Sequence, residues 1–349
     1  MKSNGSRDQA QGAATLEVVA RVAGVSRATV SRVVNDSPRV RPRVRLAVEA
    51  AILQLGYTPN RAARSLVTRR SGSIAVVITE PTGRLFEDPF FPRLVRAVSG
   101  ALASRDLQLV LLMPDPGEQA RTIRYLIGGH VDGALLVSLH DEDAIPAALA
   151  ESELPVVFVG RPPRGVDVSY VDVDNRQGGR RATAHLLELG CRRVATIAGP
   201  LDMTPGIDRL EGYRDAIRAA VGTTRELVAD GDFTHGGGVA GMQRLLAAAP
   251  DIDGVFCASD LMAAGALGAL LGSGRRVPED VCVVGYDDSP VAPATLPPLT
   301  SVSQPIEEMG REAVRLLLDC MERPGQPSRR VVLATELVPR ASSARRATS

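Results

Sequence analysis

The chain has little of several residue types on which common binding and catalytic chemistries depend. Its 349 residues include one lysine, Lys2, no tryptophan, four histidines and four cysteines. A P-loop requires a Gly-Lys pair, which a chain with lysine only at position 2 does not supply. The histidines are too dispersed for a metal motif, and the cysteines are too far apart for a C-x-x-C pair. We therefore expect no metal site, no cofactor and reduced cysteines that serve only in packing.

Long apolar runs are also missing. No stretch approaches the roughly 18 apolar residues that a membrane span requires, and the N-terminus carries no apolar core of a secretory signal. A chain of 349 residues with 44% hydrophobic residues is long enough for two or three domains with full cores. We expect a globular protein that stays in the cytoplasm and does not bind a membrane.

The charge is distributed unevenly along the chain. Residues 1–70 hold 13 Lys and Arg against 4 Asp and Glu, whereas residues 71–349 hold 28 against 36. A strongly basic segment ahead of an acidic remainder indicates that the N-terminal end contacts nucleic acid.

Within this basic segment, residues 15–58 show a helix-turn-helix spacing. Ala23-Gly24-Val25-Ser26 is typical of a helix end, a glycine turn and a Ser N-cap, so a second helix is expected to begin at Arg27. On a helical wheel this second helix has one arc free for recognition and an opposite packing arc: Arg27, Ala28, Ser31, Arg32 and Asn35 against Thr29, Val30, Val33 and Val34.

An ordinary amphipathic helix with a solvated polar face would give the same wheel. A third helical run follows, however, with apolar residues from Val44 to Leu55 at helical spacing and a stop at Gly56. With its segments AGVSRATVSRVVN and LGYTPNRAARSL, the unit resembles the lactose-repressor (LacI-type) family of bacterial transcription regulators.

The resemblance covers nearly the whole chain and implies its architecture. The expected fold is α/β, with an N-terminal all-α helix-turn-helix DNA-binding head and a periplasmic-binding-protein-like core of two doubly wound parallel sheets. The partners it implies are double-stranded DNA with a pseudo-palindromic operator, a second copy of the chain in a homodimer, and a small-molecule effector. The implied activity is transcription regulation, most often repression, and not an enzyme reaction.

The resemblance also assigns roles to residues of the head. Arg27, Ala28 and Arg32 fall at the principal major-groove positions, and arginine at two of them suggests a half-site with G·C pairs, because Arg binds guanine O6 and N7. For Ser26, Thr29, Ser31 and Asn35, the resemblance implies contacts with the DNA backbone or packing between helices. In the linker, Leu66 is expected to wedge into the minor groove with Asn60, Arg61 and Arg64 beside it.

Two positions depart from the family pattern. Val18 stands where the family usually has Asp, so the first helix relies on Glu17 for acidic charge at its N-terminus. Arg41 precedes Pro42, which removes a side-chain cap from the third helix. Arg41, Arg43 and Arg45 could compensate by contacting phosphates.

From Ser73 onward, short apolar strands alternate with amphipathic helices, which is the rhythm of a parallel sheet. Strands are expected over 74–78, 107–113, 133–138, 155–160, 194–199, 226–233, 254–259 and 281–288. The predicted divisions are a disordered tail (1–14), the head (15–58), a hinge helix or linker (59–70), an N-terminal subdomain (73–173 and 303–328), a C-terminal subdomain (174–302 and 329–340) and a disordered tail (341–349).

A ligand is expected in the cleft between the two subdomains, at the carboxyl ends of the strands. The polar and aromatic residues that follow the strands form the candidate effector set: Phe90, Phe91, Asp174, Arg209, Phe233, Ser259, Asp260 and Asp287. The resemblance places four of them, Phe91, Arg209, Phe233 and Asp287, at effector-contacting positions. An Arg fork, a carboxylate and an aromatic ring suit a sugar. The Phe rings could instead be core plugs, and Arg209 and Asp287 a structural ion pair.

Two alternatives to a sugar-responsive regulator remain. Family members that bind purines have Arg and Thr where this chain has Met203 and Pro205, which disfavours a purine or nucleoside effector. Residues Gly236 to Gly241 form a literal G-x-G-x-x-G with Asp260 about twenty residues later, as in dinucleotide-binding enzymes. Four residues, Asp232 to His235, separate these glycines from the preceding strand, and the chain is rich in glycine, so the pattern is weak.

Overall fold

The computed structural model describes residues 15–34, 37–57, 70–162, 165–220 and 226–344. The chain forms two compact units, Met1–Ser71 and Gly72–Ser349. The predicted tail 1–14, the linker residues 59–69 and the last five residues lie outside the described residues.

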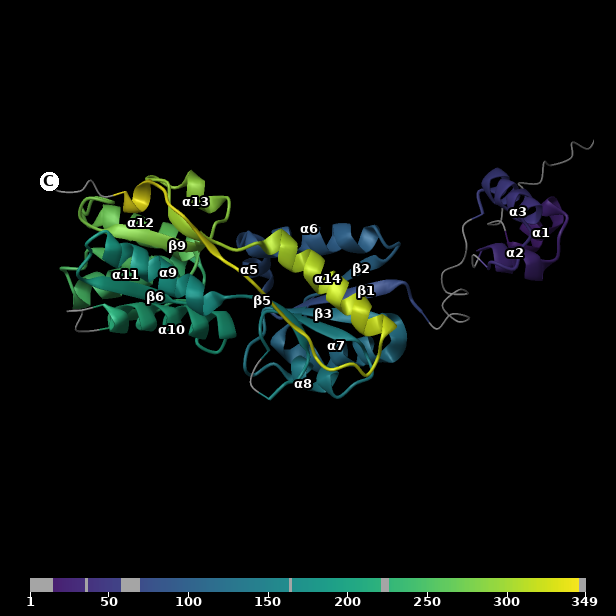
Figure 1. Ribbon diagram of the computed structural model, residues 1–349, viewed down its shortest axis with the longest axis horizontal. Coiled ribbons are helices and arrows are strands. Elements are labelled where there is room, and N and C mark those ends of the chain that lie inside the picture. Colours follow the sequence, from purple (N-terminus) through teal and green to yellow (C-terminus); the bar gives the residue numbers. More distant parts are fainter. Residues whose placement is uncertain (1–14, 35–36, 58–69, 163–164, 221–225, 345–349) are drawn as a thin grey trace, which may run out of the picture. The chain divides into compact units, whose positions relative to one another are not determined.

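The first unit is the predicted three-helix head (Figure 1), made of α1 (Leu16–Ala23), α2 (Arg27–Val34) and α3 (Pro42–Leu55). Gly24 and Gly56 follow α1 and α3 in the left-handed conformation, with φ of 67° and 59°, where a glycine carries no steric penalty. The apolar side chains of all three helices meet in one small core, which contains Val19, Ala20, Val30, Val33, Val48, Ala51 and Tyr57. The helix-turn-helix prediction is confirmed.

The second unit contains two six-stranded sheets. The first sheet has the order β11-β5-β4-β3-β1-β2 and is parallel throughout. Its strands are β1 (Ser73–Ile78), β2 (Gln108–Leu112), β3 (Gly133–Val137), β4 (Val156–Val159), β5 (Ser169–Val173) and β11 (Arg330–Leu333). Its central strands are buried along nearly their whole length because helices cover both faces.

The helices on the first sheet form two layers. One layer packs α6 (Phe90–Ala103) and α14 (Ile306–Glu322) against the sheet, with the short α5 (Thr82–Glu87) beside them. The other contains α7 (Gln119–Tyr125) and α8 (Ala144–Ala150), together with the short turns Pro116–Glu118 and Leu126–His130. Figure 1 shows α14 lying along the first sheet beside α6.

The second sheet has the order β12-β10-β9-β8-β6-β7, and only β12 is antiparallel to its neighbour. Its strands are β6 (Val194–Ala198), β7 (Val228–Asp230), β8 (Gly254–Cys257), β9 (Cys282–Asp287), β10 (Thr300–Ser303) and β12 (Glu336–Val338). One face carries α9 (Asn175–Glu188) and α10 (Thr204–Ala219), and the other α11 (His235–Ala248) and α12 (Asp260–Gly272). The short α13 (Val291–Ala294) lies next to α12.

The chain passes between the two sheets three times: from β5 to α9, from β10 to α14 and from β11 to β12. The yellow C-terminal segment in Figure 1 makes the third passage. The prediction that 329–340 belong wholly to the second subdomain is wrong for β11, since Arg330 to Leu333 pair with β5 of the first sheet. The passage therefore falls between Leu333 and Glu336.

The C-terminal tail is a second correction. Residues Ala341–Ser343 form a 3-10 turn, and the side chains of Ser342 and Ser343 are buried. Ser342 Oγ accepts a hydrogen bond from the Thr300 amide at 2.8 Å and donates one to the Val283 carbonyl at 2.6 Å. The predicted disorder of 341–349 is thus wrong for its first three residues, because hydroxyl groups tie them to β9 and β10.

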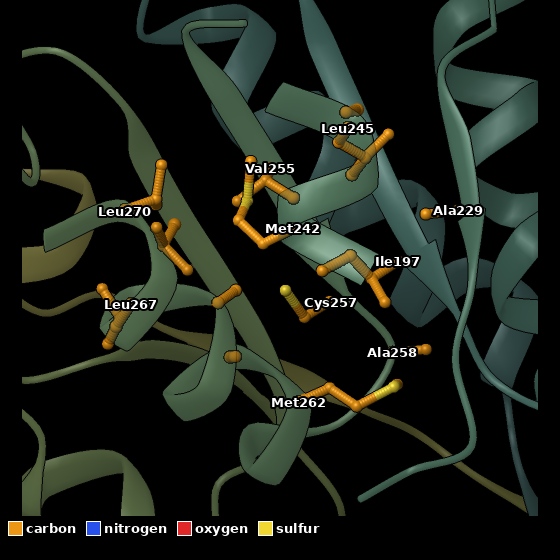
Figure 2. Close-up of a cluster of buried hydrophobic side chains, with 14 of the residues drawn as sticks. Ile197, Ala229, Met242, Leu245, Val255, Cys257, Ala258, Met262, Leu267 and Leu270 are labelled. Atoms are coloured by element: carbon orange, nitrogen blue, oxygen red, sulfur yellow. The ribbon is translucent and has the colours of Figure 1, made fainter. Parts of the chain in front are cut away.

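The core of the second subdomain explains the glycines of the G-x-G-x-x-G pattern. Figure 2 shows side chains of α11, α12 and β8 meeting in this core, among them Met242, Val255 and Met262. The pattern lies inside α11, where a Cβ on Gly238 would approach the Met262 carbonyl oxygen to 2.1 Å and one on Gly241 would approach the Ile197 side chain to 2.8 Å. These two glycines let α11 pack closely on its neighbours.

We expect Gly238→Ala to destabilise the protein by about 1–3 kcal/mol, because the new methyl group must push α11 away from the backbone of α12. The matched control is Gly268→Ala in α12, where a Cβ meets nothing within 4 Å. Alanine there should stabilise the helix by about 0.5–1 kcal/mol. Urea unfolding of both variants measures the difference, and equal stabilities would contradict the packing role.

Candidate functional site

The exposed face of α2 is the candidate DNA-reading surface. Ser26 Oγ accepts the Thr29 amide at 3.2 Å and so caps the helix as predicted. Val30 and Val33 are buried, whereas Arg27, Ala28 and Arg32 are exposed, in agreement with the helical wheel. Ser31 and Thr29 are half-buried. Asn35 and the linker residues Asn60, Arg61, Arg64 and Leu66 lie outside the described residues.

Arg27 already has a partner within the head. Its Nε lies 3.0 Å from Glu17 Oε1 in the first turn of α1, and both side chains are more than half exposed. The pKa of Glu17 is lowered, chiefly by a backbone hydrogen bond at the helix N-terminus and also by Thr15 and Arg27. Because water screens such an exposed pair, Arg27 can exchange it for a base or phosphate contact.

One of the three arginines that were predicted to contact phosphates has a different role in the structure. Arg45 Nη2 donates to the Ser37 carbonyl at 2.8 Å and holds the connection between α2 and α3. Arg41 occupies the N-cap of α3 without a side-chain cap, as its sequence implied. Arg41 and Arg43 are exposed and remain available to phosphates.

The second candidate site is a cavity in the core at the carboxyl ends of the strands, where the topology predicts a ligand. Its empty volume is about 710 Å³, counting the part that is open to solvent. Both subdomains supply its walls, which consist of Arg84, Asp88, Phe90, Phe91, Ser138, Leu139, Val159, Gly160, Arg161, Asp172, Asn175, Met203, Thr204, Pro205, Arg209, Phe233, Ser259, Asp287, Gln304 and Met309.

Arg209 is the most constrained charged group in this cavity. It lies in α10, not in a strand-end loop as expected, and only 5% of it is exposed. Its Nε donates to Asn175 Oδ1 at 2.8 Å and its Nη1 to the Ala258 carbonyl at 2.6 Å. The guanidinium carbon lies 3.7 Å from the centre of the Tyr286 ring. Hydrogen bonds and stacking thus fix its position before any ligand enters.

Asp287, at the end of β9, faces Arg209 across 3.6 Å. Its Oδ1 accepts a hydrogen bond from Gln304 Nε2 at 2.5 Å. Burial raises the pKa of this carboxyl group well above its ordinary value, although Arg209 opposes the shift. Asp287 also has a φ of 108°, a strained conformation for a residue with a side chain. Both residues line the cavity and pair with each other, so pairing and ligand contact are compatible roles.

The aromatic residues divide into rings of the core and rings of the cavity wall. Phe91 is 2% exposed, belongs to the first subdomain's core and also lines the cavity, with Phe90 edge-on at 5.3 Å. Phe233 has a φ of 64°. Its ring fills the space beside Gly199, where a Cβ would approach to 2.2 Å. The Arg84 guanidinium carbon lies 5.1 Å from the centre of the Phe233 ring, and the Arg209 guanidinium also lies over this ring. Phe233 is therefore a part of the cavity wall that contacts two arginines.

Two of the predicted effector residues do not line the cavity. The Asp174 side chain accepts the Gln177 amide at 2.9 Å and caps α9. Asp260 is buried and accepts hydrogen bonds from Ser301 at 2.6 Å and from the Ser289 amide at 2.7 Å. Of the predicted set, Phe90, Phe91, Arg209, Phe233, Ser259 and Asp287 do line it.

Several polar residues of the wall were not in the candidate effector set: Arg84, Asp88, Arg161, Asp172, Asn175 and Gln304. Asp172 and Asn175 lie within two residues of Asp174, so the prediction identified the right strand end but the wrong side chain. Asp88 lies two residues before the predicted Phe90, and this position was a usable signal. Nothing in the local sequence marks Arg84 or Arg161, since arginine is common throughout the chain.

Polar contacts connect the two subdomains beside the cavity. One group of them involves, on the second subdomain, the segment 202–208, which comprises the end of the loop after β6 and the start of α10. His140 Nδ1 lies 2.7 Å from Asp202 Oδ2, and the Asp141 amide donates to the Asp202 carbonyl at 3.0 Å. Arg161 Nη2 binds both carboxylate oxygens of Asp208 at 2.6 and 2.7 Å. We call this set of contacts the seam.

His140 also contacts a buried carboxylate of its own subdomain, with Nε2 3.3 Å from Glu80 Oε1. Glu80 Oε2 accepts a hydrogen bond from Arg84 Nη1 at 2.8 Å, which links the seam to the cavity wall. Hydrogen bonds with Glu80 and then with Asp202 raise the pKa of His140 to about 9, against an opposing effect of burial. At neutral pH, His140 is therefore protonated and donates to both carboxylates.

Other expectations concern absences. Among the described residues, no helix has the length and apolar character needed to cross a membrane. No cluster of three or more His, Cys, Asp or Glu side chains in the described ranges could hold a metal ion. The four cysteines are free, and three of them are buried.

Comparisons with known proteins identify the family of the chain. Residues 15–60 match the model of bacterial regulatory proteins of the lacI family, and residues 183–343 match a periplasmic binding protein-like domain. The HTH-type transcriptional regulator CelR of Thermobifida fusca is 54% identical over 333 residues, covering 94% of this chain and 98% of that protein.

Two solved structures extend the similarity to the fold. A transcriptional regulator CelR–cellobiose complex is 51% identical with a TM-score of 0.75, covering 94% of this chain and 99% of that one. The lac repressor dimer bound to operator and an anti-inducer is 28% identical with a TM-score of 0.83, covering 95% and 99%. The relatives are DNA-binding regulators, and the dinucleotide-enzyme alternative finds no support among them. By sequence and fold, the chain belongs to the lacI family of bacterial regulatory proteins.

Proposed function

We propose that this protein is a homodimeric, cytoplasmic repressor of carbohydrate-utilisation genes, and that a disaccharide of the cellobiose type controls its binding to the operator. As a lacI-family member it is a sequence-specific DNA-binding transcription regulator, not an enzyme. What we propose beyond this is the identity of the effector and of the target genes.

The observation that carries the proposal is the cavity between the subdomains. It combines a fixed guanidinium group (Arg209), buried carboxylates and amides, and aromatic walls at Phe91 and Phe233. Such a set offers directional hydrogen bonds to hydroxyl groups and apolar surface to a sugar ring. The relative whose structure contains cellobiose is 51% identical to this chain, which supports a disaccharide of that kind.

The wall disfavours the purine alternative. Met203 and Pro205 line the cavity and offer no hydrogen-bond donor from their side chains to a purine ring. A thermal-shift screen against cellobiose, other disaccharides and nucleosides tests the effector class, because a ligand specific to the native state raises the melting temperature. A shift with nucleosides alone would overturn the sugar assignment.

The proposed mechanism is a change in the arrangement of the two subdomains, which three segments of the chain connect. A ligand that touches both walls favours the closed arrangement only through its differential affinity for that state, typically about 1–3 kcal/mol. Closure would change the separation of the two N-terminal subdomains in the dimer, and with it the pairing of the linkers 59–70. Leu66 would then wedge into the minor groove or be withdrawn from it.

For operator recognition, we expect Arg27→Ala and Arg32→Ala each to cost about 1–3 kcal/mol on the preferred operator, with relaxed specificity at one base pair per half-site. Arg43→Ala is the control for phosphate contacts and should weaken all sequences alike. Fluorescence anisotropy with a panel of operator mutants measures this. Unchanged base preference in Arg27→Ala would rule out its role in base readout.

For the effector site, we expect Asp287→Ala to abolish the response to the sugar while operator binding is retained. Removing the carboxylate takes away a ligand contact and leaves the charge of Arg209 less well compensated. Operator binding titrated with cellobiose measures the response, and circular dichroism checks the fold. Unchanged ligand affinity would place the effector elsewhere, and loss of folding would assign Arg209 and Asp287 to a structural ion pair.

The seam predicts a pH dependence. Because the folded-state pKa of His140 is raised from 6.5 to about 9, its stabilising contribution is complete below about 6.5 and is lost as the pH rises through about 9. We expect Asp202→Asn to weaken cellobiose binding by roughly 5-fold at pH 7, where one charged contact of the closed state is lost. The difference from the wild type should shrink at pH 10, as calorimetric titrations at both pH values can determine. A constant difference would show that His140 does not act through its charge.

A further inference from the structure

Not every carboxylate that lines the cavity has an arginine partner. Three arginines line it, and each already has a carboxylate partner in the protein: Arg84 pairs with Glu80, Arg161 with Asp208 and Arg209 with Asp287. Two more carboxylates, Asp88 and Asp172, line the same cavity. Among the described residues, neither of them forms an ion pair.

Asp88 and Asp172 each use one oxygen within the protein. Asp88 Oδ1 accepts the Phe90 amide at 2.9 Å. Asp172 Oδ1 accepts the Val173 amide at 2.8 Å and Asn175 Nδ2 at 3.1 Å. Within the described part of the chain, no hydrogen bond reaches the second oxygen of either carboxylate. Both residues are buried, so these oxygens are free acceptors in a cavity wall.

Free carboxylate oxygens select for hydrogen-bond donors. A sugar hydroxyl donates to them, whereas a phosphate or carboxylate on the ligand would bring a like charge into a poorly solvated site. Negative charge is already disfavoured there, since burial raises the pKa of Asp172 to about 6 and also raises the pKa of Asp88. The buried Nε of Arg84 has no partner in the described structure and can donate to a neutral hydroxyl oxygen.

We propose that the effector site takes its sugar only without a phosphate or carboxylate group, and that Asp88 and Asp172 enforce this choice. This inference rests on the proposed function and specifies the chemistry of its ligand. It also limits the reaction that supplies the effector, which must be glycoside hydrolysis or uptake without phosphoryl transfer to the sugar.

The test compares three ligands derived from one disaccharide on the full-length protein: cellobiose, its 6-phosphate and cellobionate. Isothermal titration calorimetry at pH 7.5, where ordinary carboxylates are ionised, should give at least about 100-fold weaker binding for both anions. In Asp172→Asn or Asp88→Asn, which keep the shape of the side chain, this discrimination should fall by about 10-fold.

Asp174→Asn is the matched control, because it removes the same charge two residues away but outside the cavity wall. Its discrimination should equal that of the wild type. Circular dichroism of every variant reports folding independently of the sugar. Should either aspartate variant fail that check, the wild-type comparison of the three ligands still decides the proposal.

The outcomes distinguish a failure of the charge selection from a failure of the sugar assignment. Tight binding of the phosphorylated or oxidised sugar to the wild type would overturn the charge selection and leave the sugar-responsive regulator standing. Unchanged discrimination in both aspartate variants would remove their assigned role. Failure of all three sugars to bind a protein that still binds its operator would overturn the proposed effector class itself.

Discussion

The burial of one guanidinium group determines how the effector side of the core is built. A charge as buried as that of Arg209 costs several kcal/mol unless it is paired and hydrogen-bonded. Its partners come from three separate segments: Asn175 at the start of α9, the Ala258 carbonyl after β8 and Asp287 at the end of β9. Satisfying Arg209 therefore fixes the start of α9 and the ends of β8 and β9 relative to one another, and the wall they form exists before ligand binding.

Much of the fold could be predicted because its strands are continuous apolar runs that alternate with helices. Strands β5 and β11, which are absent from the predicted set, lack that signal. Strand β5 contains the polar residues Ser169 and Asp172, and β11 has alternating exposed positions at the sheet edge. No local feature tells which sheet β11 joins, since its pairing with β5 brings together residues that are far apart in sequence. The position of the third passage between the subdomains therefore depends on the pairing of β11 with β5 and not on local β-propensity.

The candidate site was predictable to a lesser degree. Strand ends located Phe233, Asp287 and the neighbourhood of Asp172, because parallel strands bring their carboxyl ends to one edge. Which carboxylate faces the cavity depends on where the strand stops: Asp174 has already left β5 and caps α9. The seam was not predictable at all, since His140 and Asp202 are 62 residues apart and belong to different subdomains, which only the tertiary structure makes neighbours.

The composition of the seam bears on how the switch is controlled. Its contacts are ion pairs and hydrogen bonds among groups that water would solvate well in an open cleft, so forming them yields little net free energy. Closure of the apolar walls, by contrast, yields favourable free energy only when a ligand fills the space between them. The seam therefore fixes the geometry of closure, while the ligand must supply most of the free energy that favours it. Since a ligand shifts an equilibrium only by its differential affinity, a sugar that reaches both the Arg209 wall and the Arg84 wall is the one that can operate the switch.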